Sequence, residues 1–122
     1  MIKAFHNLLE KSKDPGIVNI SGGAGSFGDA VFVLAHHFSK LPVYGITKLA
    51  PNSLTVKMTT QLKESKIRIN SVDPGFTATY PGTEQWGAKP VSEEAKGIVW
   101  AATLPQDGPT GAFFRDAQPL SW

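Results

Sequence analysis

The sequence predicts an α/β fold in which about three short parallel strands alternate with flanking helices. Stretches with apolar side chains at helical spacing alternate along the chain with brief, mostly apolar runs typical of buried strands. Turns that contain proline or glycine separate most of these segments. The resulting order is helix, strand, helix, strand, helix, strand, which is the order that parallel α/β units produce.

The first helix and strand precede a glycine-rich loop. Apolar side chains recur at helical spacing over residues 2–13, and a turn follows at residues 14–16. Residues 17–20 then read as a short buried strand that ends at Ser21. Residues 29–40 fit either a helical turn or a folded loop.

The second helix is predicted from Pro42 to about Ser65, and it contains Pro51. An internal proline removes a backbone hydrogen bond and costs a helix about 3 kcal/mol, so we expect a kink or weakening there. Residues 67–72 alternate as a strand, and residues 76–90 are loop-like. A third helix opens at Ser92, and residues 112–114 form a last short strand.

Composition excludes several classes of protein. The 122 residues include no cysteine, which excludes disulfides, thiol nucleophiles and cysteine metal sites. A net charge of +2 is too small to indicate a nucleic-acid partner, and no apolar run approaches the roughly 20 residues that a membrane helix needs. We therefore expect one cytoplasmic domain with neither a membrane nor a nucleic-acid partner, and no metal site at the adjacent His36 and His37.

A glycine motif follows the first strand. Residues 23–28 satisfy G-x-G-x-x-G, the pattern of a loop that binds dinucleotide phosphates at the start of a helix. That pattern also calls for an acidic residue about 20 positions further on. Residues 41–54 contain none. A nucleotide-binding module built on these glycines therefore remains a minor alternative.

Tyr44 and Lys48 lie four residues apart, so a helix brings both side chains to one face. The pKa of a tyrosine is about 10, and a fixed positive charge beside the phenol favours the phenolate and lowers that pKa. Such a pair suits proton transfer to a carbonyl oxygen. The same spacing also occurs by chance on helix surfaces.

Three motifs in order are more specific than the pair alone. The Ser21 glycine loop, Tyr44-x-x-x-Lys48 and residues 70–75, together with residues 107–116, resemble the short-chain dehydrogenase/reductase family, especially its carbonyl-reductase-like members. The resemblance implies the carboxy-terminal half of a Rossmann-type doubly wound parallel sheet. It also implies that residues 1–122 are a single partial domain, without the amino-terminal half that binds the cofactor phosphates, and that the glycine loop is not the phosphate loop.

The resemblance assigns roles to individual residues. It implies that Tyr44 is the general acid/base, and that Lys48 binds the nicotinamide ribose and lowers the pKa of Tyr44. The other cofactor contacts that it implies are Pro74, Gly75, Thr77 and Thr79. The cofactor would be NAD(P)(H), with NADP favoured over NAD, and the substrate a small carbonyl or alcohol. The helix that bears Tyr44 and Lys48 would be the surface for homo-oligomer formation.

One position departs from the family pattern in a way that bears on catalysis. Gly22 stands where the family usually has its catalytic serine. Ser21 is our candidate to replace that serine, and Ser26 is a second. The departures at Gly22 and Pro51, with the missing half, support an alternative hypothesis: a catalytically silent, truncated fragment that at most associates through its helices.

Overall fold

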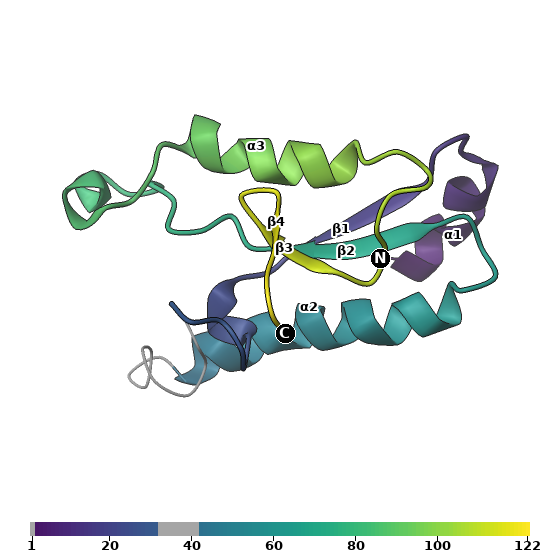
Figure 1. Cartoon of the computed structure of the whole chain (residues 1–122), viewed down its shortest axis with the longest axis horizontal. Coiled ribbons are helices and arrows are strands. Elements are labelled where there is room, and N and C mark those ends of the chain that lie inside the picture. Colours follow the sequence, from purple (N-terminus) through teal and green to yellow (C-terminus); the bar gives the residue numbers. More distant parts are fainter. Residues whose placement is uncertain (1, 32–41) are drawn as a thin grey trace.

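The computed structural model describes residues 2–31 and 42–122 (Figure 1). Its helices and strands alternate as the sequence predicts. The helices are α1 (Ile2–Lys11), α2 (Pro42–Gln61) and α3 (Val91–Ala102), the strands are β1 (Gly16–Ile20), β2 (Arg68–Val72), β3 (Phe113–Arg115) and β4 (Gln118–Pro119), and two short 3-10 helices are η1 (Gly23–Gly25) and η2 (Thr83–Trp86). His36 and His37 lie outside the described residues.

The strands form one sheet in the order β1-β2-β3-β4. The first three strands run parallel, with Ile17 opposite Ile69 and Ser71 opposite Phe113. The expected three parallel strands are therefore confirmed. Strand β4 returns antiparallel to β3 and was not expected. The chain reverses there through Asp116 and Ala117, whose φ angles are 51° and 59°, a conformation that alanine seldom adopts.

Two helices cover opposite faces of the sheet, α3 on one face and α2 on the other (Figure 1). Strand β2 lies between β1 and β3, and each of its five residues is buried. An apolar cluster of Leu62, Ile67 and Ile69 joins the end of α2 to the start of β2, and α1 packs against it through Ile2 and Leu9. This core fixes α2 against the sheet.

Helix α2 continues through Pro51 as one element. It ends at Gln61 rather than near Ser65. The Ser65 hydroxyl donates a hydrogen bond to the Leu62 carbonyl and accepts one from the Ile67 amide, which closes a turn before β2. Serine favours such local side-chain to backbone bonds over helix continuation.

Residues 76–90 form an arm that projects from the sheet, with η2 near its tip (Figure 1). Its neck is closed by two backbone hydrogen bonds, from the Lys89 amide to the Phe76 carbonyl and from the Ala78 amide to the Lys89 carbonyl. The prediction of a loop holds for most of the segment. Within the two described ranges, no helix combines the length and the apolar character that crossing a membrane requires.

Candidate active site

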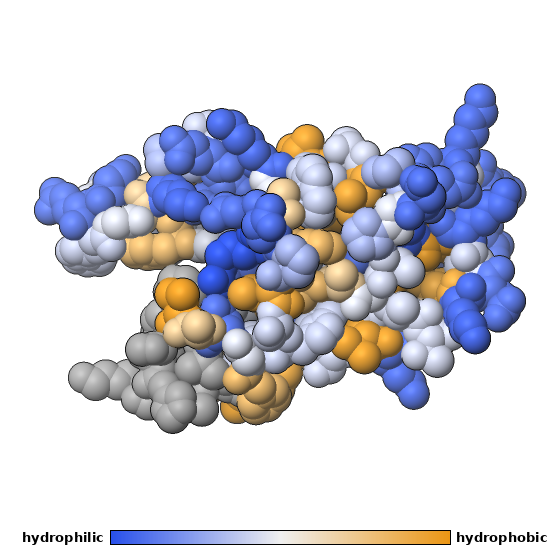
Figure 2. Space-filling view, in the orientation of Figure 1, coloured by the Kyte–Doolittle hydropathy of each residue, from blue (hydrophilic) through white to orange (hydrophobic). Residues whose placement is uncertain are grey.

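A hollow of about 380 Å³ opens where β1 and β2 end. In open α/β sheets, ligands bind at the carboxyl ends of the strands. Figure 2 shows the surface hollowed beside the arm. The residues that line the hollow are Gly22, Gly23, Ala24, Tyr44, Asp73, Gly75 and Phe76.

Helix α2 brings Tyr44 and Lys48 together, as their spacing predicts. The Lys48 Nζ lies 5.8 Å from the centroid of the Tyr44 ring, within the range of a cation–π contact. Tyr44 remains 47% exposed and lines the hollow. The phenol can therefore reach a small molecule bound there.

The pKa of Tyr44 is raised in this structure, not lowered. Burial raises it most, and the negative charge of Asp73 raises it further. The direction is opposite to the one expected from the neighbouring Lys48, because the sequence showed neither the burial of the phenol nor the nearby charge of Asp73. At neutral pH the phenol keeps its proton and is a hydrogen-bond donor.

Both candidate serines make buried structural contacts. The Ser21 hydroxyl donates to the Lys48 carbonyl at 2.9 Å. The Ser26 hydroxyl donates to the Ser121 carbonyl at 2.7 Å and accepts bonds from the amides of Gly28 and Asp29. Neither serine lines the hollow. In this structure their hydroxyls hold the loop against α2 and against the carboxy-terminal segment.

Gly22 leaves space beside the phenol. A β-carbon built on Gly22 would lie 3.6 Å from the Tyr44 Oη and 3.6 Å from the Lys48 Cγ. These are ordinary van der Waals separations, so a side chain at this position fits. A serine at position 22 would sit next to the Tyr44 hydroxyl.

The cofactor positions implied by the family resemblance follow β2. Gly75 lines the hollow directly after Pro74, and its φ of 78° favours glycine. Thr77 and Thr79 lie further along, in the neck of the arm, where Thr77 pairs with Lys89. Neither threonine lines the hollow. Of these four positions the structure brings Gly75 to the hollow beside Tyr44.

The glycine motif forms a buried turn rather than an open cradle. A β-carbon on Gly25 would overlap the backbone of Lys48 and Leu49, so glycine lets η1 lie directly on α2. Residues 26–31, which follow the turn within the first described range, hold no α-helix. A phosphate loop requires a helix that opens at the glycines. The motif here serves close packing of the loop on α2.

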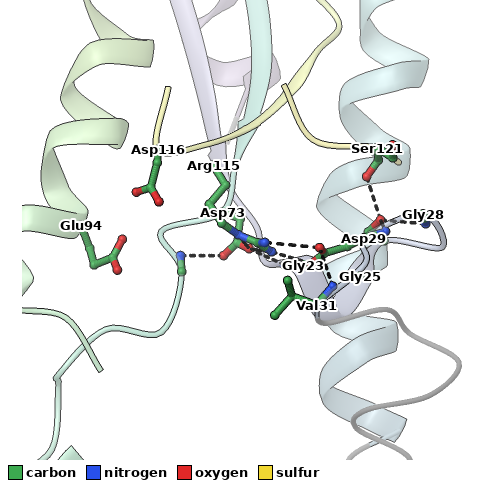
Figure 3. A network of polar contacts seen from close by, with 12 residues as sticks. Gly23, Gly25, Gly28, Asp29, Val31, Asp73, Glu94, Arg115, Asp116 and Ser121 are labelled. Atoms are coloured by element: carbon green, nitrogen blue, oxygen red, sulfur yellow. Dashed lines mark hydrogen bonds and ion pairs between the residues drawn. The ribbon is translucent and has the colours of Figure 1, made fainter. Parts of the chain in front are cut away.

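Sequence reasoning missed a charge cluster behind this loop, formed by Asp29, Asp73 and Arg115 (Figure 3). Asp73 follows directly after a buried strand, and Arg115 continues the apolar pair Phe113 and Phe114. A charged residue at the carboxyl end of a buried strand was the available signal for both. Nothing in the local sequence marks Asp29 as their partner.

The comparisons with known proteins agree on the family. Residues 1–89 match the family model of short chain dehydrogenases. A curated relative, "Short-chain dehydrogenase anuI" of Penicillium roqueforti, is 35% identical in an alignment of 108 residues that covers 84% of this chain and 42% of that protein. This chain belongs to the short-chain dehydrogenase family.

Solved structures share the fold. The NADPH-bound carbonyl reductase from chicken fatty liver has a TM-score of 0.75 at 22% identity, and the carbonyl reductase Sniffer of D. melanogaster has a TM-score of 0.74 at 22% identity. Each comparison covers 99% of this chain and 51% of the other protein. The fold is therefore a partial Rossmann-type α/β fold, and the chain spans about half the length of these carbonyl reductases.

Proposed function

We propose that residues 1–122 are the tyrosine-bearing part, a single partial domain, of a cytoplasmic oxidoreductase that interconverts a small carbonyl and its alcohol. One observation carries the proposal: Tyr44 lines the hollow at the carboxyl ends of β1 and β2, with Lys48 beside its ring. Catalytic and binding groups of open α/β sheets gather at this edge. Family membership supports the same reaction class.

The nicotinamide end of NAD(P)(H) fits the residues present. The hollow has the size of a small-molecule site, and Gly22 leaves space in it beside the Tyr44 hydroxyl. By the family resemblance, Lys48, Pro74, Gly75, Thr77 and Thr79 would hold this end of the cofactor, and of these Gly75 lines the hollow. The cofactor supplies the hydride. We favour NADP because two similar solved structures are described with NADPH or NADP bound.

The task of Tyr44 is proton transfer at the substrate oxygen. In reduction its hydroxyl donates the proton while the carbonyl carbon gains the hydride, and in oxidation the phenolate takes the proton back. The raised pKa of Tyr44 keeps the phenol protonated at neutral pH. Reduction requires this protonated form, because the phenol is then the proton donor.

A second function, association without turnover, also has a specific observation in its favour. Gly22 offers no hydroxyl beside Tyr44, and the hydroxyls of Ser21 and Ser26 bond to backbone groups elsewhere. Loss of one donor at a reacting oxygen typically costs about 3 kcal/mol of transition-state stabilisation. The first turns of α2 expose Val43 and Ile46, at 72% and 61%, which a second copy of the chain would cover.

The test compares two matched tyrosine variants of the chain. NADPH binding is measured through tryptophan fluorescence, and NADPH oxidation is measured with small ketones and aldehydes. Tyr44→Phe should abolish turnover, whereas Tyr80→Phe, on the exposed arm, should leave it unchanged. Equal turnover in the two variants would refute the role of Tyr44. Saturable NADPH binding without any turnover, or sedimentation as a dimer without binding, would favour the second function.

A further inference from the structure

The guanidinium of Arg115, at the end of β3, lies between two buried carboxylates (Figure 3). Its Nε and Nη2 donate to the Asp73 Oδ2 at 2.8 and 2.6 Å. Its Nη1 donates to the Asp29 Oδ1 at 3.3 Å, and Nη2 also bonds to the Asp29 Oδ2. Asp29 is 2% exposed and Asp73 is 4% exposed. The cluster thus joins segments that are 86 residues apart.

Asp73 holds both walls of the hollow. Its Oδ2 accepts a hydrogen bond from the Gly23 amide at 2.8 Å, and its Oδ1 accepts one from the Gly75 amide at 2.8 Å. Gly23 lies in the loop after β1, and Gly75 lies in the turn after β2. Both residues line the hollow that contains Tyr44. The orientation of this single carboxylate therefore sets how the two walls stand relative to each other.

The loop wall rests directly on the cluster. A β-carbon on Gly23 would overlap the Asp29 carboxylate and the Arg115 Nη2. Because no side chain separates the loop from these charges, a shift of the guanidinium would be transmitted to the Gly23 backbone. The position of Arg115 is thus coupled to the shape of the hollow.

We propose that Arg115 is a positioning residue of the hollow that contains Tyr44. Arg115 orients Asp73 so that the Gly23 and Gly75 amides are held in place, and its positive charge offsets the negative charge of Asp73 at the Tyr44 hydroxyl. The effect of Arg115 on turnover rests on the proposed function, whereas its effect on the shape and charge of the hollow does not. A lysine at position 115 would keep the charge but not the planar fork of donors that reaches both carboxylates.

The charge of Arg115 is secure over the accessible pH range. Burial acts to lower the pKa of Arg115, but the hydrogen bonds to Asp29 and Asp73 and their negative charges together outweigh burial and raise it. Replacing Arg115 by methionine would leave the two carboxylates facing each other without this cation. The Asp73 charge would then act on Tyr44 without that offset, while Lys48 and Glu94 would remain in place.

The first test follows the ionisation of Tyr44 as a function of pH, through the absorbance of the phenolate form of tyrosine at about 295 nm. The chain has two tyrosines, so a Tyr80→Phe background leaves Tyr44 as the single reporter. In that background we expect Arg115→Met to raise the midpoint of the Tyr44 titration by roughly half a pH unit or more. Arg115→Lys, and Lys96→Met on exposed α3, should stay close to the parent. An unchanged midpoint in a folded Arg115→Met chain would overturn the electrostatic role.

A second test covers the case in which Arg115→Met unfolds. An unfolded chain would titrate near the ordinary tyrosine value of about 10, below the parent, and so would be recognised. With glycine amides labelled with nitrogen-15, Arg115→Lys should speed hydrogen exchange at Gly23 and Gly75 about tenfold, because their shared acceptor is released. Gly82 and Gly108 should not change. Unchanged exchange at all four would overturn the positioning role. Neither test uses turnover, so a failure of the proposed enzyme activity is seen separately.

Discussion

A β-carbon added to Gly22 would lie 3.6 Å from the hydroxyl oxygen of Tyr44, so the space beside the phenol is open at the end of β1. The neighbouring Ser21 does not fill it, because its hydroxyl bonds to the Lys48 carbonyl. The phenol is consequently left without a hydroxyl neighbour from this loop. The gap sits at the point where a substrate oxygen would meet Tyr44.

We expect Gly22→Ser to increase carbonyl reduction by about a hundredfold, since one added donor at the reacting oxygen is worth about this much. The measurement is the rate of NADPH oxidation with a small ketone. Gly22→Ala is the matched control, because it adds the same β-carbon without a hydroxyl. A gain of equal size in the alanine variant would show that the effect comes from packing, and not from hydrogen bonding.

Glu94 supplies a prediction about pH. Burial raises its pKa most, the nearby Lys89 acts to lower it, and Asp116 and Asp73 raise it again, so that the net shift is upward. A raised pKa means that the fold favours the neutral carboxyl. Stability is therefore lost as the pH rises from the unfolded value of about 4.3 through the higher folded pKa.

Glu94→Gln should accordingly raise the free energy of unfolding at pH 7, and this advantage should shrink below about pH 4, where the carboxyl is neutral in both states. Urea unfolding at the two pH values measures it. Glu93→Gln, at the exposed neighbouring position of α3, should change little at either pH. The prediction is wrong if Glu94→Gln destabilises the chain at pH 7 while Glu93→Gln does not.

Gly25 provides a test of the glycine motif. Because its β-carbon would overlap the backbone of α2 at Lys48 and Leu49, Gly25→Ala must push the loop off the helix. We expect a loss of about 2 kcal/mol or more in the free energy of unfolding, without any nucleotide present. Gly22→Ala, with space around it, should lose less than half of that. Urea unfolding of both variants measures these losses. Equal losses of stability in Gly25→Ala and Gly22→Ala would contradict the packing explanation.

Local patterns in the sequence predicted most of the fold. Helical and strand periodicity depend on neighbouring residues, so α1, β2 and the start of α2 were found close to their true bounds. The reversal into β4 was missed because it turns through Ala117 at a positive φ, which alanine does not signal. The end of α2 was misjudged because the Ser65 side chain closes a turn that periodicity does not record.

In the candidate site, too, local contacts could be predicted from the sequence and long-range contacts could not. Tyr44 and Lys48 were found because a single helix turn relates them. The direction of the Tyr44 pKa was wrong, because burial in the folded chain raises it most and the charge of Asp73, in the turn after β2, raises it further. Arg115 and Asp29 were missed for the same physical reason, since they meet only after the sheet has formed. Electrostatics at this site depends on long-range contacts that a single sequence does not display.

A buried chain of hydroxyls holds the Tyr44 helix to the sheet and supports a last prediction. The Thr55 hydroxyl lies 2.8 Å from the Ser71 hydroxyl of β2 and accepts a hydrogen bond from the Asn19 amide group of β1 at 2.8 Å. Thr55 is fully buried. Thr55→Val keeps the shape but removes the partner of both polar groups, so we expect a loss of about 1–3 kcal/mol in the free energy of unfolding.

The matched control for this change is Thr59→Val, one turn further along α2, where the hydroxyl donates to the Thr55 carbonyl in the same helix. That variant should lose well under 1 kcal/mol, because no contact between helix and sheet is removed. Thr55→Ser should restore most of the stability. If urea unfolding gives the same loss for both valine variants, the hydroxyl chain does not anchor α2. Packing around Leu62 and Ile69 would then be what fixes Tyr44 relative to the sheet.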